Sequence, residues 1–324
     1  MSKSRGEELL EALVNGEDSD IKPQSRMEEY LLAAVKKSGT DGLPKPISRG
    51  DALLHQLVDV VSNSSGGGGE EGEVSTVAKL ISGKTTEVDD SVFEGITHIE
   101  GYGVFYYNRR ITKVCVPETI TSWGDYAFAG CDKLTDVKIM TGDVGHYAFS
   151  SCKELKTVQL SKNTKTIGMY SFYNCKKLET IDLSNVTRLC QDAFSQCMSL
   201  ISANIENVTD VDNSAFVSCA KLSEVKLSSN LTRVGSYGFA YCVALTSITF
   251  PASVTEIGSN ALKVGEETNK ATITFLGTTP PTITTSTFET ARLNKIIVPA
   301  GCGDAYKSAT NWSNFADYIE EATA

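Results

Sequence analysis

A cysteine recurs at a nearly constant interval through the middle of the 324-residue chain. Six of them follow one another at steps of 21, 23, 22, 22 and 23 residues: Cys131, Cys152, Cys175, Cys197, Cys219 and Cys242. A phenylalanine stands three residues before each one and a leucine three residues after it. A period in the low twenties is typical of solenoids, in which one unit cannot bury its apolar face without neighbours. The sequence therefore predicts a stack of units.

The unit at residues 171–183 shows how each repeat is expected to fold. Ile181 and Leu183 are two residues apart, so they face the same side of a short strand. Stacked copies of this strand predict a parallel β-sheet. Upstream, we expect the chain to turn at Gly168, because glycine tolerates turn conformations. Phe172 is expected to fill the coil from the convex side.

The cysteine of each unit is expected to be a small buried thiol, because free cysteine packs like a small hydrophobic residue. In an earlier, degenerate unit Asn108 occupies the cysteine position; its amide could donate to the turn backbone but could not join a disulfide. The chain has nine cysteines, an odd number, and lacks a Cys-x-x-Cys pair typical of zinc sites. We predict free thiols and no cofactor, with a disulfide or metal ladder as the alternative.

The repeat loosens towards both ends of the array. Leu262 replaces the phenylalanine, and Pro280 and Pro281 interrupt the period before a last apolar strand at 296–299. Atypical terminal units are expected, because an exposed coil end must be covered by a cap. We predict an array with its N-terminal cap at 74–299 and a C-terminal cap at 300–324. The expected cap residues are Tyr306, Trp312, Phe315, Tyr318 and Ile319.

The repeated pattern is Ile-Gly-x-x-Ala/Ser-Phe-x-x-Cys-x-x-Leu-x-x-Ile-x-Leu, and it resembles the BspA-type leucine-rich repeat of bacterial proteins over about residues 91–299. We therefore predict an α/β solenoid, a right-handed leucine-rich repeat array of about 22–23 residues per repeat with a parallel β-sheet. Members of this family are mostly surface proteins with adhesive or host-recognition roles. The resemblance thus implies binding rather than catalysis.

Three capping-box-like motifs, beginning at Ser4, Ser25 and Ser48, predict short helices within residues 1–61. Such helices are marginal alone, so they are expected to self-associate or to dock on a larger assembly. Residues 62–73 have the Gly/Ser/Glu composition of a flexible linker. The segment 23–32 resembles the leader of proteins encoded among the tail genes of phages and prophages. That second resemblance implies a virion-associated component with an N-terminal attachment segment.

Charge and hydropathy exclude several classes of protein. The formal net charge of -10 would repel a phosphate backbone, so no nucleic-acid partner is expected. No segment approaches the ~20 apolar residues of a membrane span, and the start lacks a secretory signal. We expect no membrane insertion and a virion-associated or cytoplasmic protein, with any surface exposure by a non-classical route. His55, His98 and His146 share no spacing that would indicate a catalytic or metal site.

A polar column is the candidate ligand site. Its members stand at mid-strand between two inward-facing positions, on the outer face of the sheet: Lys138, Gln159, Asp182, Asn204, Lys226 and Thr249. A merely solvated face is the alternative. A second set, Tyr126, Tyr147, Tyr170 and Tyr237, is expected to cover the core edge.

The predicted function is that of a non-enzymatic recognition or adhesion protein, which binds a protein or carbohydrate at a cell surface through the array, as in a phage tail. The alternative is an intracellular structural or protein-interaction scaffold. A solenoid without convergent His, Asp or Ser groups favours either of these over an enzyme.

Overall fold

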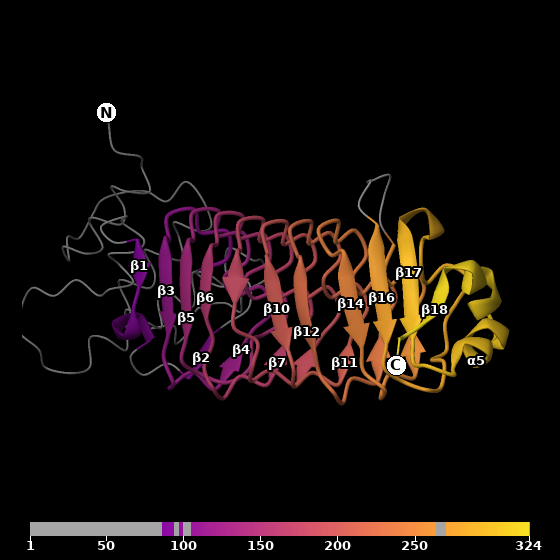
Figure 1. Ribbon diagram of the computed structural model, residues 1–324. Helices are drawn as coiled ribbons and strands as arrows, with labels where there is room; N and C mark the ends of the chain where they lie inside the picture. The colour runs from indigo at the N-terminus through magenta and orange to yellow at the C-terminus, as the bar shows by residue number, and fades with distance from the viewer. Residues whose placement is uncertain (1–85, 94–96, 100–104, 264–269, 324) are drawn as a thin grey trace, which may run out of the picture.

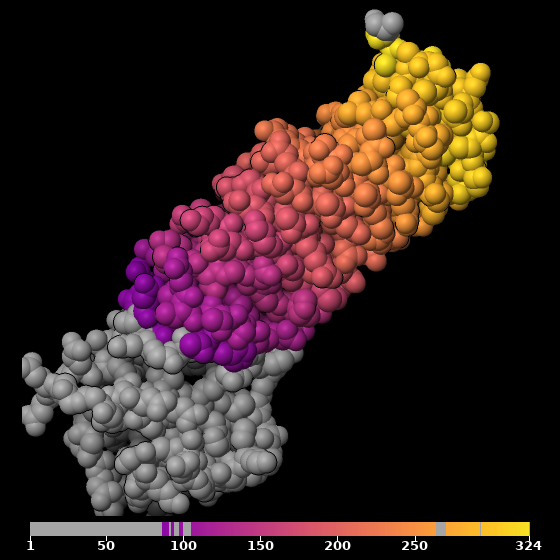
Figure 2. Space-filling view, turned by 90° about the horizontal axis from the view of Figure 1, so that it is seen from below, coloured from indigo at the N-terminus to yellow at the C-terminus, as the bar shows by residue number. Residues whose placement is uncertain are grey.

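The computed structural model describes residues 86–93, 97–99, 105–263 and 270–323, which wind into a parallel β-solenoid (Figure 1). The coils follow one another along one axis in the order of the sequence (Figure 2). The helices predicted within 1–61 and the linker at 62–73 lie outside the described residues.

One side of the solenoid is built from the longer strands, and we call it the long-strand face. Its strands pair in parallel within three successive sheets, and Figure 1 shows β10, β12 and β14 side by side across the breaks. In sequence order they are β1 (Glu87–Val88), β3 (Lys113–Val116), β5 (Asp136–Ile139), β6 (Thr157–Gln159), β8 (Thr180–Ile181), β10 (Ser202–Ile205), β12 (Glu224–Leu227), β14 (Ser247–Phe250), β16 (Ala271–Phe275), β17 (Leu293–Val298) and β18 (Ile319–Glu321).

A second side, the short-strand face, was not predicted from the sequence. Each of its strands has two residues, and all pair in parallel with the neighbouring coil. They are β2 (His98–Ile99), β4 (Ser122–Trp123), β7 (Thr166–Ile167), β9 (Arg188–Leu189), β11 (Asp210–Val211), β13 (Arg233–Val234) and β15 (Glu256–Ile257). Two-residue strands carry no period-two pattern, which is why the repeat did not reveal them.

The third side of each coil is a run of turns, which corrects the predicted α/β class to a parallel β-solenoid for the described residues. In the regular coils from Phe128 to Phe239, two residues of each turn adopt a positive φ, one placed two residues before the phenylalanine and one placed two residues after it. In the coil of Phe172 these are Tyr170 (φ 54°) and Asn174 (φ 60°). Two left-handed residues within one short turn prevent an α-helix from forming.

The phenylalanines, which the sequence predicted to fill each coil, also form a continuous stack through the core. Successive rings from Phe128 to Phe239 lie 5.3–5.5 Å apart, centroid to centroid, with planes within 8° of parallel. Every ring in this stack is at most 1% exposed. Offset stacking of this kind adds about 0.5–1.5 kcal/mol per pair beyond the burial of area.

The repeated glycine is required by close packing between coils, which corrects the expected role in turning. Among the described glycines, positive φ occurs at Gly130 and Gly301 and not at Gly168 or Gly258. A Cβ on Gly258 would lie 2.5 Å from the backbone nitrogen of Ser236 in the preceding coil. The position therefore excludes a side chain because the neighbouring backbone occupies that space.

The six repeating cysteines are free and buried, and each thiol reaches back to the coil before it. The Sγ atoms donate to the carbonyl oxygens of the preceding phenylalanines at 3.0–3.2 Å. Asn108 differs from the expected donor role. Its Oδ1 accepts from the backbone N–H groups of Arg110 (2.9 Å) and Ile111 (3.3 Å) within its own turn.

The C-terminal end is closed by short helices and one more strand. The helix α5 (Gly303–Ser308) and the 3₁₀-helix η3 (Trp312–Tyr318) precede β18, which pairs with β17. Tyr306 and Trp312 are fully buried, and they donate hydrogen bonds of 2.8 Å to the carbonyl oxygens of Gly277 and Pro281. Two further 3₁₀-helices are η1 (Asp90–Phe93) and η2 (Thr290–Arg292).

Candidate ligand-binding face

The predicted polar column lies on the outer side of the long-strand face. Within the sheets, the register places Lys138 beside Cys115 on one side and Gln159 on the other. Asn204 lies beside Lys226, and Thr249 beside Thr274. All of the column residues are exposed except Asn204, which is half-buried. The alternation of buried and exposed residues along β5 and β14 accounts for this arrangement.

A depression of about 450 Å³ opens over the N-terminal part of this face. It is lined by side chains and backbone of four neighbouring strands, β1, β3, β5 and β6. Lys138 and Gln159 belong to the depression, whereas Asp182, Asn204, Lys226 and Thr249 do not line it. The structure therefore brings together two of the six predicted residues.

Acidic and basic groups alternate along the wall of the depression. Lys113 Nζ lies 2.9 Å from the carboxylate of Glu87, and this hydrogen bond raises the pKa of Lys113. Asp136 accepts hydrogen bonds from the hydroxyls of Thr135 and Thr157, which lower the pKa of its carboxyl group. Both charges are thus retained at neutral pH, and the wall offers hydrogen-bond donors and acceptors side by side.

Cys115 lines the depression beside Lys138, and sequence reasoning did not single it out. Burial raises the pKa of its thiol, and so does a hydrogen bond with Asp90. The thiol therefore stays protonated at neutral pH, and its Sγ lies 3.9 Å from the Sδ of Met140. A protonated thiol is a poor nucleophile, so the geometry favours binding over covalent chemistry. Its position two residues after Lys113 in the strand was the signal available in the sequence.

Two residues of the predicted column accept hydrogen bonds from the turns that follow their own strands. Oδ1 of Asp182 accepts from the backbone N–H of Ser184 at 2.9 Å, and this bond lowers the pKa of the Asp182 carboxyl group. Oδ1 of Asn204 accepts from the backbone N–H of Glu206 at 3.4 Å. These side chains stabilise the turns that follow β8 and β10, which accounts for their identity without a ligand.

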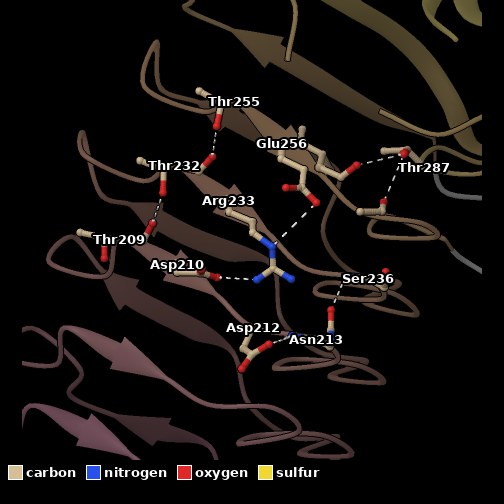
Figure 3. A network of polar contacts seen from close by, with 12 residues as sticks. Thr209, Asp210, Asp212, Asn213, Thr232, Arg233, Ser236, Thr255, Glu256 and Thr287 are labelled. Carbon is tan, nitrogen blue, oxygen red and sulfur yellow. Dashed lines mark hydrogen bonds and ion pairs between the residues drawn. The ribbon is translucent and has the colours of Figure 1, made fainter. Parts of the chain in front are cut away.

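The short-strand face carries a separate polar network (Figure 3). Arg233 lies between two carboxylates of neighbouring coils, with Nη1 3.0 Å from Asp210 and Nε 3.8 Å from Glu256. Beside it, the hydroxyls of Thr232 and Thr255 donate to carbonyl oxygens one coil back. All of these groups bond from coil to coil, so the network stabilises the stack.

The tyrosines of the second predicted set line the turns. Tyr126, Tyr147 and Tyr170 stack at 4.2 Å and 4.7 Å with nearly parallel rings. The three rings are half-buried, in agreement with the expected cover over the core edge, whereas Tyr237 is 38% exposed. A hydrogen bond to the carboxylate of Asp192 raises the pKa of Tyr170.

The described histidines lie apart from one another. His98 in β2 bonds to the hydroxyl of Ser122 at 2.6 Å, and Nδ1 of His146 accepts from the backbone N–H of Met169 at 2.8 Å. His55 lies outside the described residues.

Within the described part of the chain, no cluster of three His, Cys, Asp or Glu side chains is arranged to hold a metal ion. The same residues contain no helix long and apolar enough to cross a membrane.

The family model described as the BspA type leucine rich repeat region (6 copies) matches residues 97–220, 142–269 and 201–315. No curated protein matches the sequence.

Three crystal structures illustrate the likeness to known folds. A leucine-rich repeat protein from Bacteroides ovatus has 22% identity and a TM-score of 0.48, with 63% of this chain and 59% of that chain covered. A leucine rich cell surface protein from Faecalibacterium prausnitzii has 26% identity and a TM-score of 0.42, with the same two coverages. The leucine rich repeat protein of T. pallidum has 25% identity and a TM-score of 0.41, with 46% of this chain and 72% of that chain covered. The match thus spans under two thirds of each of the first two proteins.

Proposed function

Because the chain belongs to the BspA-type leucine-rich repeat family, we propose that it is a non-enzymatic recognition protein of the surface or adhesion type. Its ligand is a protein or carbohydrate on a cell surface. The ligand binds to the outer side of the long-strand face, with the depression over β1, β3, β5 and β6 as the centre of the site.

The observation that carries this proposal is the convergence of polar side chains in that depression. Its volume of about 450 Å³ falls within the ~300–1,000 Å³ of ligand pockets. Lys138, Gln159 and Thr157 present a cation, an amide and a hydroxyl towards the same space. The described lining contains no aromatic ring, so recognition rests on hydrogen bonds and charge. Sugar hydroxyls and carboxylates, or the backbone and acidic side chains of a protein, suit these groups.

In this function the remaining parts of the chain serve attachment and closure. Residues 1–61 act as a short helical attachment segment, residues 62–73 as a tether, residues 74–299 as the array and residues 300–324 as its C-terminal cap. The attachment segment docks on a larger assembly such as a phage tail, or self-associates. The capping motifs at Ser4, Ser25 and Ser48 support helices there.

Binding of the purified full-length chain to glycan arrays and to bacterial and host cells tests the recognition function. We expect saturable binding that Lys138→Ala weakens by about tenfold, the effect of losing a charged contact worth ~1.4 kcal/mol. Lys226→Ala is the matched control, since Lys226 is exposed on the same face but lies outside the depression. Absence of binding to every surface, or equal losses for the two variants, would contradict the proposal.

Fractionation tests the attachment function separately. Antibody against the chain should detect it in purified virions released from a producing strain. Recovery in the cytosol alone would contradict attachment to a virion and would favour an intracellular interaction scaffold.

A further inference from the structure

The carboxylates of the depression over β1, β3, β5 and β6 already have partners within the protein. Glu87 pairs with Lys113 at 2.9 Å, and Asp136 accepts a hydrogen bond from the hydroxyl of Thr157 on the next strand. Asp89, the third acid of the described lining, has a partner as well. A cationic ligand would therefore have to compete with contacts that the protein itself supplies.

Lys138 and Gln159 are the donors that remain available in the depression. They are neighbours in the register of β5 and β6, and both are exposed. In the part of the chain that the structure describes, Lys138 forms no ion pair and the Gln159 amide no hydrogen bond. The carboxylate of Asp90 bonds instead to the thiol of Cys115. A cation beside an amide thus calls for an acceptor that carries negative charge.

A carboxylate is the acceptor that suits this pair of donors. Adjacent strands lie about 4.8 Å apart, so the two side chains can reach the two oxygens of one carboxylate. The surrounding charge also favours an anion at this end of the depression. Residues 151–180, which include β6 and β8, carry six lysines and two glutamates, a net charge of +4 in a chain whose net charge is -10. All six lysines are exposed, so their field attracts an anionic group.

The lining favours a sugar over an acidic peptide as the source of that carboxylate. Protein interfaces are centred on aromatic residues and arginine, and the described lining contains neither. A sugar hydroxyl is donor and acceptor at once, so a ring of hydroxyls can lie against the mixed row of Glu87, Lys113 and Asp136. A peptide with several acidic side chains would instead place further negative charge beside Glu87 and Asp136.

On the basis of the proposed function, we infer that the depression binds an acidic sugar, a uronic or sialic acid unit, whose carboxylate lies between Lys138 and Gln159. The hydroxyls of the sugar face the row of Glu87, Lys113 and Asp136. This orientation places the negative charge of the ligand at the lysine-rich end of the depression and keeps it away from the acidic residues of β1 and of the turn after it.

Isothermal titration calorimetry with the full-length chain tests the inference on two matched pairs of probes. One pair is trigalacturonate and its methyl ester, and the other is sialyllactose and its methyl ester. Each ester keeps the hydroxyls and lacks the negative charge. We expect a free acid to bind at least about tenfold more tightly than its ester, because a charged contact is lost. Whether the uronate or the sialate binds distinguishes the two sources of the carboxylate.

Lys138→Gln removes the cation and keeps a polar side chain, so affinity for the acid should fall about tenfold. Affinity for the ester should not change. Gln159→Ala removes one neutral donor and should cost about threefold. Lys226→Gln is the matched control, because Lys226 is exposed in the same column on β12 and lies outside the depression. It should bind the acid as the unaltered chain does.

Failure of both acids to bind, equal affinity for acid and ester, or equal losses for Lys138→Gln and Lys226→Gln would overturn the inference. Tighter binding of a hexaglutamate peptide than of either acid would also overturn it and would assign the depression to an acidic protein segment. In each case the proposed function stands if the chain still binds cells or glycan arrays through Lys138. It fails together with the inference if the chain binds no surface at all.

Discussion

The thiol of Cys175 donates a hydrogen bond to the carbonyl oxygen of Phe149, one coil earlier, at 3.2 Å. Both residues are fully buried, and the same contact recurs from Cys131 to Cys242. One residue type therefore fills the core and also connects each coil to the coil before it. This dual role explains why the period of the cysteines is so regular.

The buried thiols should make the chain sensitive to alkaline pH. Burial raises the pKa values of Cys152, Cys175, Cys197 and Cys219 well above that of an exposed thiol. Above pH ~8.5 the unfolded chain therefore loses these protons first, and the free energy of unfolding falls. The free energy of unfolding is expected to fall by about 1.4 kcal/mol per pH unit for each thiol.

Urea unfolding between pH 7 and pH 10 measures this loss. Cys175→Ser keeps a hydrogen-bond donor near Phe149 and removes one titrating thiol. The free energy of unfolding of this variant should therefore fall less steeply above pH 9 than that of the unaltered chain. Identical slopes for the variant and the unaltered chain would show that the buried thiols do not govern the alkaline transition.

Phe172→Ala should destabilise the middle of the array. Phe172 is fully buried and stacks on Phe149 and Phe194 at 5.5 Å and 5.3 Å. Truncation leaves a cavity in one coil and should cost about 3–5 kcal/mol. Lys138→Ala, at an exposed position, should be nearly neutral. Equal thermal melts for the two variants would be incompatible with the phenylalanine stack.

Gly258→Ala should be destabilising, although alanine normally favours regular structure. Its Cβ would lie 2.5 Å from the nitrogen of Ser236, which belongs to the backbone and cannot move aside as a side chain can. We expect a loss of about 1–3 kcal/mol in denaturant unfolding. Gly142→Ala is the control, because nothing lies within 4 Å of its Cβ position. A neutral Gly258→Ala would argue against close contact between the coils.

Glu321 should contribute stability that acid removes. Its carboxylate accepts from the backbone N–H groups of Gly301 and Gly303, each at 2.8 Å, and these bonds lower its pKa. The contribution is present above the unfolded pKa of about 4.3 and is lost as pH falls through the lower folded pKa. Between pH 6 and pH 3 the melting temperature of Glu321→Gln should therefore fall less than that of the unaltered chain.

Glu206→Gln is the control for that comparison, as an exposed carboxylate in the turn after β10. It should follow the unaltered chain across the same pH range. If Glu321→Gln does so too, the C-terminal contact does not depend on charge.

The core of the six regular coils could be predicted because phenylalanine, cysteine and leucine recur at the same positions in each of them. The Phe-Cys-Leu spacing places every ring and thiol at the same point of a coil, and burial confirms all six of each. The role of Gly258 could not be predicted in the same way. Residue 258 has to be glycine because the backbone of Ser236 in the neighbouring coil occupies the space of a Cβ. Such a contact depends on how closely two coils approach.

The sequence predicted which residues lie on the candidate face, but it did not predict which of them form a common site. Alternation along each strand shows which side chains point outward, and Lys138 and Gln159 do so. It does not show that Asp182 bonds to Ser184 in its own turn, nor that Cys115 joins the depression. The first feature depends on a bond between a side chain and its own turn, and the second depends on which neighbouring coils surround a surface; alternation along a strand shows neither.

The left-handed turn positions have a consequence for how this protein can diverge. In the part of the chain that the structure describes, fourteen non-glycine residues have a positive φ; they are tyrosine, serine, asparagine, aspartate and glutamine, and none is β-branched or proline. Within that limit the side chain changes from coil to coil while the backbone repeats unaltered. Natural variation can therefore rewrite the chemistry of the turn surface one coil at a time, so that new specificities evolve on a scaffold whose folding they leave intact.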